Sequence, residues 1–265
     1  MMNKRMFLLM GALLIFSHLL LAQEDNIIAK KPNLLHIGFE AGVGTIFGDT
    51  DKPTMIRENQ YHYYYDYNYY GSVFNFQEST LYYFGVKPEY TINKRFAVAA
   101  GLRLSISKST LYSDRDYYLW KISETGINTH YVSIESIDQN NFFIGVPMEI
   151  RYFTRSRDTF VRHYFVFGAS LLFLMASTNN VSFIFPDMNK YRNEINAQLD
   201  KPDFFQGYIH IGTGLKIGKS SRPHAYAEFF VPIMVGGGKM NSFTQTYGAA
   251  GFGINVTLRI PFYID

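Results

Sequence analysis

Apolar and polar residues alternate along eight segments of this chain, and the connections between them are in turn long and very short. In the last segment Phe252, Ile254 and Val256 share one parity, whereas Gly253 and Asn255 share the other. Because side chains alternate between the two faces of a strand, each segment has one apolar face. The pattern predicts strands over residues 34–48, 79–92, 95–107, 141–153, 161–176, 204–218, 224–234 and 246–263. The segment 161–176 is apolar on both parities, and a buried helix fits it almost as well.

The connections indicate how these strands are arranged. Residues 93–94, 154–160 and 219–223 form short polar connections, whereas the longer ones cover residues 49–78, 108–140, 177–203 and 235–245. Bacterial outer-membrane barrels have this asymmetry, with short periplasmic turns and long extracellular loops. Each segment also suffices for a tilted membrane-spanning strand, which takes about 9–11 residues. We therefore predict an all-β fold, an eight-stranded antiparallel up-and-down transmembrane β-barrel over residues 34–265.

Charged residues within the predicted strands fall on the polar parity. Nine residues with this placement are Glu40, Lys87, Glu89, Arg103, Glu149, Arg151, Lys216, Glu228 and Arg259. Charge this dense is too costly for the core of a soluble barrel, so we expect lipid outside and an ion-paired network inside. The interior of an eight-stranded barrel is just wide enough for side chains to fill it, which favours a plugged lumen over a pore or proton path. A soluble, lipocalin-like periplasmic barrel is a further alternative.

The first 22 residues have the features of a cleaved signal peptide. Lys4 and Arg5 precede an apolar run over residues 7–21, and Ala22 is the expected last residue before cleavage. An uncleaved anchor is the alternative, although the run is short for one. Residues 23–33 would then be a periplasmic segment. The chain contains no cysteine, which excludes a lipid-modified lipoprotein and disulfide chemistry.

Neither charge nor motifs indicate catalysis. Without Lys4 and Arg5 the chain carries 23 basic and 22 acidic residues, a net charge of +1 that does not suggest a nucleic-acid partner. The seven histidines show no metal-ligand spacing. A trio of His130, Ser133 and Glu135 has the residue types of an acid–base–nucleophile set, but any loop offers such trios by chance. The glycine-rich stretch 41–48 precedes no helix, so phosphate binding is not supported. We predict no enzyme, no metal and no cofactor.

The first long connection contains an unusual run of seven tyrosines. They are Tyr61, Tyr63, Tyr64, Tyr65, Tyr67, Tyr69 and Tyr70. Tyrosine offers large contact area at low entropic cost, so this loop is a candidate recognition site for protein, glycan or ligand. A hairpin with an aromatic girdle is the alternative, because tyrosine also favours strands. The second long connection repeats the aromatic character with Tyr112, Tyr117, Tyr118 and Trp120, and residues 187–200 are compatible with a short helix.

The stretches 30–44, 142–153, 164–173 and 248–263 resemble the PorT-like outer-membrane β-barrel family common in Bacteroidota. The resemblance implies an eight-stranded barrel inserted by the outer-membrane assembly machinery. Some members of the family are accessory parts of type IX secretion and gliding, and no active-site residues carry over. Partners would be outer-membrane lipid and other envelope proteins, and a surface receptor or adhesion barrel is the alternative. The ending Tyr263–Asp265 departs from the usual terminal aromatic residue.

Overall fold

A computed structural model describes residues 34–48, 55–56, 75–113, 117–125, 128–246 and 248–263, and residues Leu34–Phe262 form one compact unit. The strands are β1 (Leu34–Phe47), β2 (Asn75–Thr91), β3 (Phe96–Ala100), β4 (Leu102–Ser113), β5 (Tyr118–Thr125), β6 (Asn128–Phe153), β7 (Val161–Phe183), β8 (Phe205–Ile217), β9 (His224–Gly236), β10 (Lys239–Asn241), β11 (Thr244–Gln245) and β12 (Ala250–Tyr263). Two short helices, η1 (Pro186–Tyr191) and α2 (Arg192–Gln198), separate β7 from β8. None of the described helices is long and apolar enough to cross a membrane.

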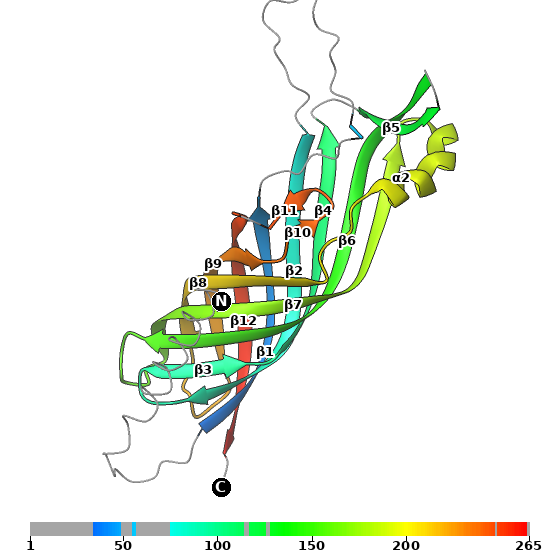
Figure 1. Ribbon diagram of the computed structural model, residues 1–265. Helices are drawn as coiled ribbons and strands as arrows, with labels where there is room; N and C mark the ends of the chain where they lie inside the picture. Colours follow the sequence, from blue (N-terminus) through cyan, green and yellow to red (C-terminus); the bar gives the residue numbers. More distant parts are fainter. Residues whose placement is uncertain are drawn as a thin grey trace, which may run out of the picture. The chain divides into compact units, whose positions relative to one another are not determined.

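Eight strands close into a ring, which confirms the predicted fold class. The order is β1, β2, β3 with β4, β6, β7, β8, β9 and β12, and β12 pairs with β1 (Figure 1). The pairings from β1–β2 through β9–β12 are antiparallel between neighbours. The third strand is interrupted between β3 and β4 at Gly101, where a Cβ would lie 2.0 Å from the Val86 carbonyl oxygen.

The outward face of the ring is apolar and the inward face is polar. On β12 the side chains of Phe252, Ile254 and Val256 are at least half exposed, whereas Asn255 and Thr257 between and beyond them are buried. This is the inside-out arrangement of a transmembrane barrel, in which the outer side chains meet lipid and the inner ones meet each other. The strand prediction for 161–176 is therefore correct, and the helix alternative is wrong, because β7 pairs along its length with β6 and β8.

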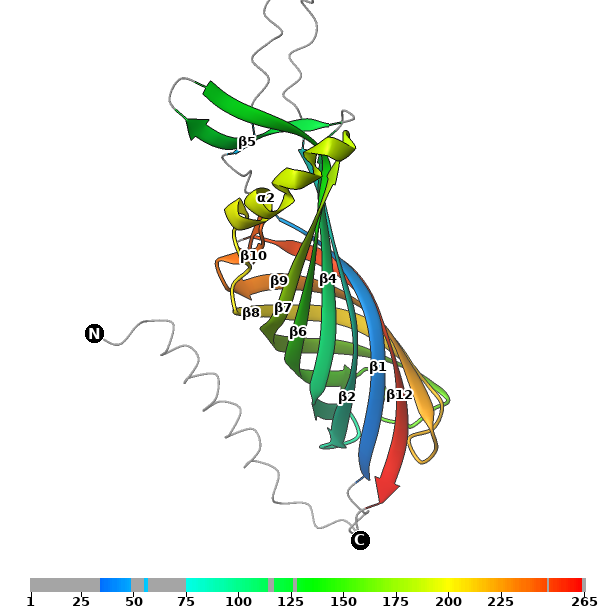
Figure 2. The same cartoon turned by 90° about the vertical axis from the view of Figure 1, so that its right-hand side faces the viewer.

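Strands β2, β4, β6 and β7 continue well past the apolar belt. The outward apolar residues end at Ile106 on β4 and Phe142 on β6, and the next outward positions are Lys108 and Asn140. Residues 108–113, 118–125, 128–140 and 177–183, all expected as loops, are thus strand that extends out of the bilayer. Together with β5, η1 and α2 these extensions form a structure that we call the cap, at the opposite end from β3 (Figures 1 and 2). The expected short helix within 187–200 is present.

Candidate functional site

The structure brings eight of the nine predicted lumen charges into one connected cluster. The cluster holds the acids Glu40, Glu89, Glu149 and Glu228 and the bases Lys87, Arg103, Arg151 and Arg259. All eight are buried, with at most 7% of any residue exposed. Four acids and four bases balance, so the cluster is formally neutral. A buried ionic network of this kind is tolerable because each charge has an opposite charge within 3.2 Å.

Arg151 is the central cation of this cluster. Its Nη1 lies 2.6 Å from Glu89 Oε2 and its Nη2 lies 2.8 Å from Glu228 Oε1, while Nη2 also contacts Glu149. Three carboxylates therefore share one guanidinium, which can donate five hydrogen bonds in a planar fork. Glu228 also accepts hydrogen bonds from Tyr164 and Asn255, at 2.8 Å each.

Arg103 and Lys87 connect the middle of the lumen to this centre. Arg103 binds Glu40 through two parallel hydrogen bonds of 2.8 and 2.9 Å, and Lys87 Nζ lies 2.7 Å from the same carboxylate. Glycine makes room for the side chains that surround the cluster. A Cβ on Gly214 would lie 2.5 Å from the Tyr164 hydroxyl, and one on Gly42 would lie 2.3 Å from the Tyr83 ring. Small inward residues thus let large polar side chains fill the interior.

Lys216, the ninth predicted residue, has a different partner. Its ammonium lies 2.5 Å from Asp158 in the turn 154–160, an acid outside the predicted strands. Asp158 also accepts hydrogen bonds from the Ser220 amide (2.8 Å) and hydroxyl (3.0 Å) in the turn 218–223. Arg162 links the turns further, because it donates to the carbonyls of Arg155 and Lys94. The three short turns are therefore tied together across this end of the barrel.

Asp158 makes stability at this end depend on pH. Burial by itself would raise the pKa of its carboxyl, but the hydrogen bonds and charge of Lys216, with the Ser220 contacts, hold that pKa below its ordinary value. A depressed folded pKa stabilises the protein above the unfolded pKa of about 3.9, and the stability is lost as pH falls through the folded value. We expect Asp158→Asn to lower the unfolding free energy at neutral pH by about 1 kcal/mol, since the carboxylate is partly exposed. Urea unfolding across the acidic range should show this difference shrinking as pH falls, and a constant difference would contradict it.

A hairpin from the last long connection fills the other end of the lumen. Residues 240–244, at the turn between β10 and β11, are all nearly inaccessible to solvent. Asn241 donates to Ser109 (2.9 Å) and Ser79 (3.3 Å), and the Gln139 amide donates to the Ser242 hydroxyl at 2.7 Å. Met240 packs on the apolar layer that also holds Phe230. Side chains thus occupy the barrel from the short turns to the cap.

This filling leads to a prediction about conduction. We expect the purified protein to give no conductance steps in a planar lipid bilayer, because both the ionic cluster and the hairpin close the lumen. Replacing residues 239–245 by a glycine–serine linker should leave the bilayer silent, since the cluster remains. Conductance steps in the unmodified protein would instead favour the pore interpretation.

The cap has a hydrophobic core of its own. Trp120 and Phe243 are completely buried in it, and Ile195 of α2 closes it from one side. The indole of Trp120 donates to Gln198 Oε1 at 2.6 Å. Tyr118 and Trp120, two of the aromatic residues of the second long connection, are thus core residues of the cap. The seven tyrosines from Tyr61 to Tyr70 lie outside the described residues.

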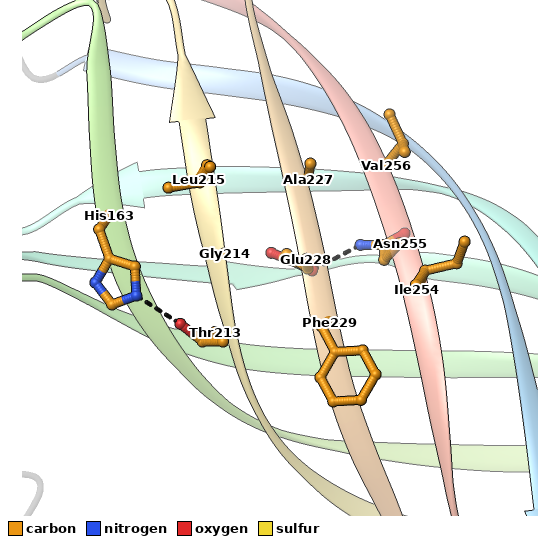
Figure 3. A pocket seen from close by; sticks show the side chains of 10 residues that line it. All are labelled: His163, Thr213, Gly214, Leu215, Ala227, Glu228, Phe229, Ile254, Asn255 and Val256. Carbon is orange, nitrogen blue, oxygen red and sulfur yellow. Dashed lines mark hydrogen bonds between the residues drawn. The ribbon is translucent and has the colours of Figure 1, made fainter.

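An open depression of about 470 Å³ lies over β7, β8, β9 and β12. Figure 3 shows two hydrogen bonds among its lining residues, one between His163 and Thr213 and one between Asn255 and Glu228. The first, 2.7 Å long, pairs two polar side chains that are only partly buried on the wall. Because the surrounding residues include Leu215 and Phe229, the depression is an irregularity of the lipid-facing wall.

The candidate chemical residues are not assembled into a reactive site. His130 lies on the opposite face of β6 from Ser133 and Glu135, because side chains alternate along a strand. The centroid of its ring lies 5.1 Å from that of the Tyr191 ring. His210 faces the lumen, with Nε2 3.7 Å from Glu149 Oε1. Within the described ranges, no group of three or more histidine or acidic side chains could hold a metal ion.

Comparisons with models of protein families and with curated proteins found no match. Among solved structures, the chain resembles Neisserial surface protein A (9% identity, TM-score 0.39, covering 86% of this chain and 97% of that one). It also resembles the outer membrane protein OprG from Pseudomonas aeruginosa (10% identity, TM-score 0.38, covering 88% of this chain and 98% of that one). A third similar structure is the attachment invasion locus protein Ail of Yersinia pestis (10% identity, TM-score 0.34, covering 88% of this chain and 100% of that one). At such low identities and TM-scores the likeness assigns no function, and the barrel described above rests on its own strand pairing.

Proposed function

We propose that this chain is a non-enzymatic integral barrel of the bacterial outer membrane that acts through its long-loop end. The observation that carries the proposal is the combination of a filled lumen with a cap built around its own buried core. A lumen packed with paired charges is suited to stability, whereas a folded cap offers a firm surface for protein contacts. Export would use a signal peptide cleaved after Ala22, and the barrel domain would cover residues 34–265. Outer-membrane location can be checked by heat-modifiable migration in detergent gels and by partition into the detergent phase.

Within this location, we propose an accessory role in envelope secretion or assembly, as the resemblance to the PorT-like family implies. The test compares the secreted and surface proteomes of a deletion strain and its parent, with the intact gene restored as a control. Loss of a class of exported proteins is the expected result. An unchanged set of exported proteins would overturn the secretion role.

A surface receptor or adhesion barrel is the second candidate. It is favoured by the tyrosine-rich stretch, which follows Ile56, a residue buried in the cap core and bridged to Trp120. Replacing all seven tyrosines by serine should abolish ligand or cell binding in this case and leave secretion intact. The secretion role predicts instead that substitutions in the cap impair secretion.

A further inference from the structure

The three short turns carry an unusual excess of positive charge. Residues 92–95, 154–160 and 218–223 contain six exposed basic side chains, which are Lys94, Arg95, Arg155, Arg157, Lys219 and Arg222. Asp158 is the only acid in these turns, and Lys216 and Ser220 already occupy its carboxylate. None of the six forms an ion pair with another residue that the structure describes. By contrast, residues 184–204 at the other end hold four acids and three bases.

These cations lie directly beside the lipid-facing surface. Arg95 directly precedes Phe96, which is 40% exposed, and Arg157 comes three residues before Phe160, which is 65% exposed. Lys219 comes two residues after the exposed Ile217. Because the turns are so short, the basic side chains cannot extend far from the apolar belt. Lysine and arginine at such a border place their stems along apolar surface and their charged ends among the headgroups.

The charges are also spread around the ring. In strand order the turns lie between β2 and β3, between β6 and β7, and between β8 and β9, three of the four junctions at this end. A soluble acidic partner would be recognised best by a patch on one side, whereas a ring of cations fits a surrounding leaflet. Basic residues near an anionic membrane surface attract it through the summed field of the headgroups.

We propose that the six basic residues bind the phosphates of anionic phospholipids in the leaflet that surrounds the short turns. The inference rests on the proposed membrane location, but it concerns the lipid preference of the barrel and not its role in secretion. It assigns the short-turn end to lipid contact, and so leaves protein contacts to the cap.

The test measures which lipids surround the purified, folded protein. Full-length protein is placed in nanodiscs of phosphatidylcholine and phosphatidylglycerol in equal parts, and spin-labelled versions of each lipid report the immobilised fraction. We compare the variant Lys94→Gln/Arg157→Gln/Lys219→Gln with the matched control Lys108→Gln/Lys190→Gln/Lys201→Gln, which removes the same charge from exposed positions away from the short turns. Within the described part of the chain the altered side chains of the first variant make no hydrogen bond, so heat-modifiable migration should confirm that it folds.

The expected result is a several-fold preference for immobilised phosphatidylglycerol that falls in the short-turn variant, persists in the control variant and weakens with added salt. Equal immobilisation of the two lipids by the unmodified protein would overturn the proposal. So would an equal fall in both variants, which would indicate net charge alone. Binding of a soluble acidic polypeptide to the protein in pure phosphatidylcholine nanodiscs, without any lipid preference, would assign the cations to a soluble partner. A secretion phenotype in the deletion strain is independent of all these outcomes.

Discussion

Arg151→Ala is expected to lower the unfolding free energy of the barrel by about 3–5 kcal/mol, the usual cost of removing one partner from a buried ionic group. The physical reason is which cation each carboxylate still contacts once Arg151 is removed. Glu149 retains Lys87 and Glu89 retains Arg259, but among the residues that the structure describes Glu228 forms no ion pair with another cation. The variant therefore leaves one buried carboxylate held only by neutral donors. Urea unfolding of the folded protein in lipid vesicles, followed by far-UV circular dichroism, measures the loss.

Two controls separate this cause from a general effect of substitution. Arg157→Ala removes an exposed arginine from a turn and should change stability by no more than about 0.5 kcal/mol. The double variant Arg151→Ala/Glu228→Gln should recover part of the loss, because it removes the uncompensated charge. A small loss in Arg151→Ala, or no recovery in the double variant, would mean that the cluster does not hold the barrel together.

Alternation was sufficient to predict the membrane-spanning part of the fold. Lipid contacts one face of each strand and the side chains of the lumen contact the other, so every second residue is apolar. This alternation is visible in the sequence even in glycine-rich strands such as β12. Parity also placed the charges inside. It could not show which charges meet, since that depends on register around the ring. Glu40 and Arg103 are 63 positions apart in the chain, and Lys216 finds its partner in a turn.

Beyond the bilayer the same signal fails for a physical reason. Residues 138–141 of β6 are polar at four consecutive positions, because one face meets water and the other meets the polar layer around the hairpin. Without an apolar face there is no alternation, and the stretch resembles a loop. The cap core was missed likewise, because Trp120 and Phe243 come from separate connections that only the folded barrel brings together. Isolated apolar residues in otherwise polar loops were the available signal.

Phe243→Ala should destabilise the cap without weakening the barrel. Phe243 is fully buried in the cap core, and truncating a buried phenylalanine usually costs about 3–5 kcal/mol. The loss should remain in the cap because that core lies beyond the apolar belt, whereas the ionic cluster stabilises the membrane-embedded strands. Trp120, the single tryptophan of the chain, is packed in the same core and therefore reports on the cap alone.

The two signals can be followed in one urea titration in lipid vesicles. In Phe243→Ala the fluorescence transition of Trp120 should move to lower urea, while the circular dichroism transition of the strands stays in place. Arg151→Ala should move the strand transition, and Phe185→Ala, which truncates a phenylalanine that is 51% exposed, should move neither. Fluorescence and circular dichroism that shift together in Phe243→Ala would show that cap and barrel unfold as one unit. The cap could then not rearrange on meeting a partner without loosening the barrel, and contacts made through it would have to be rigid.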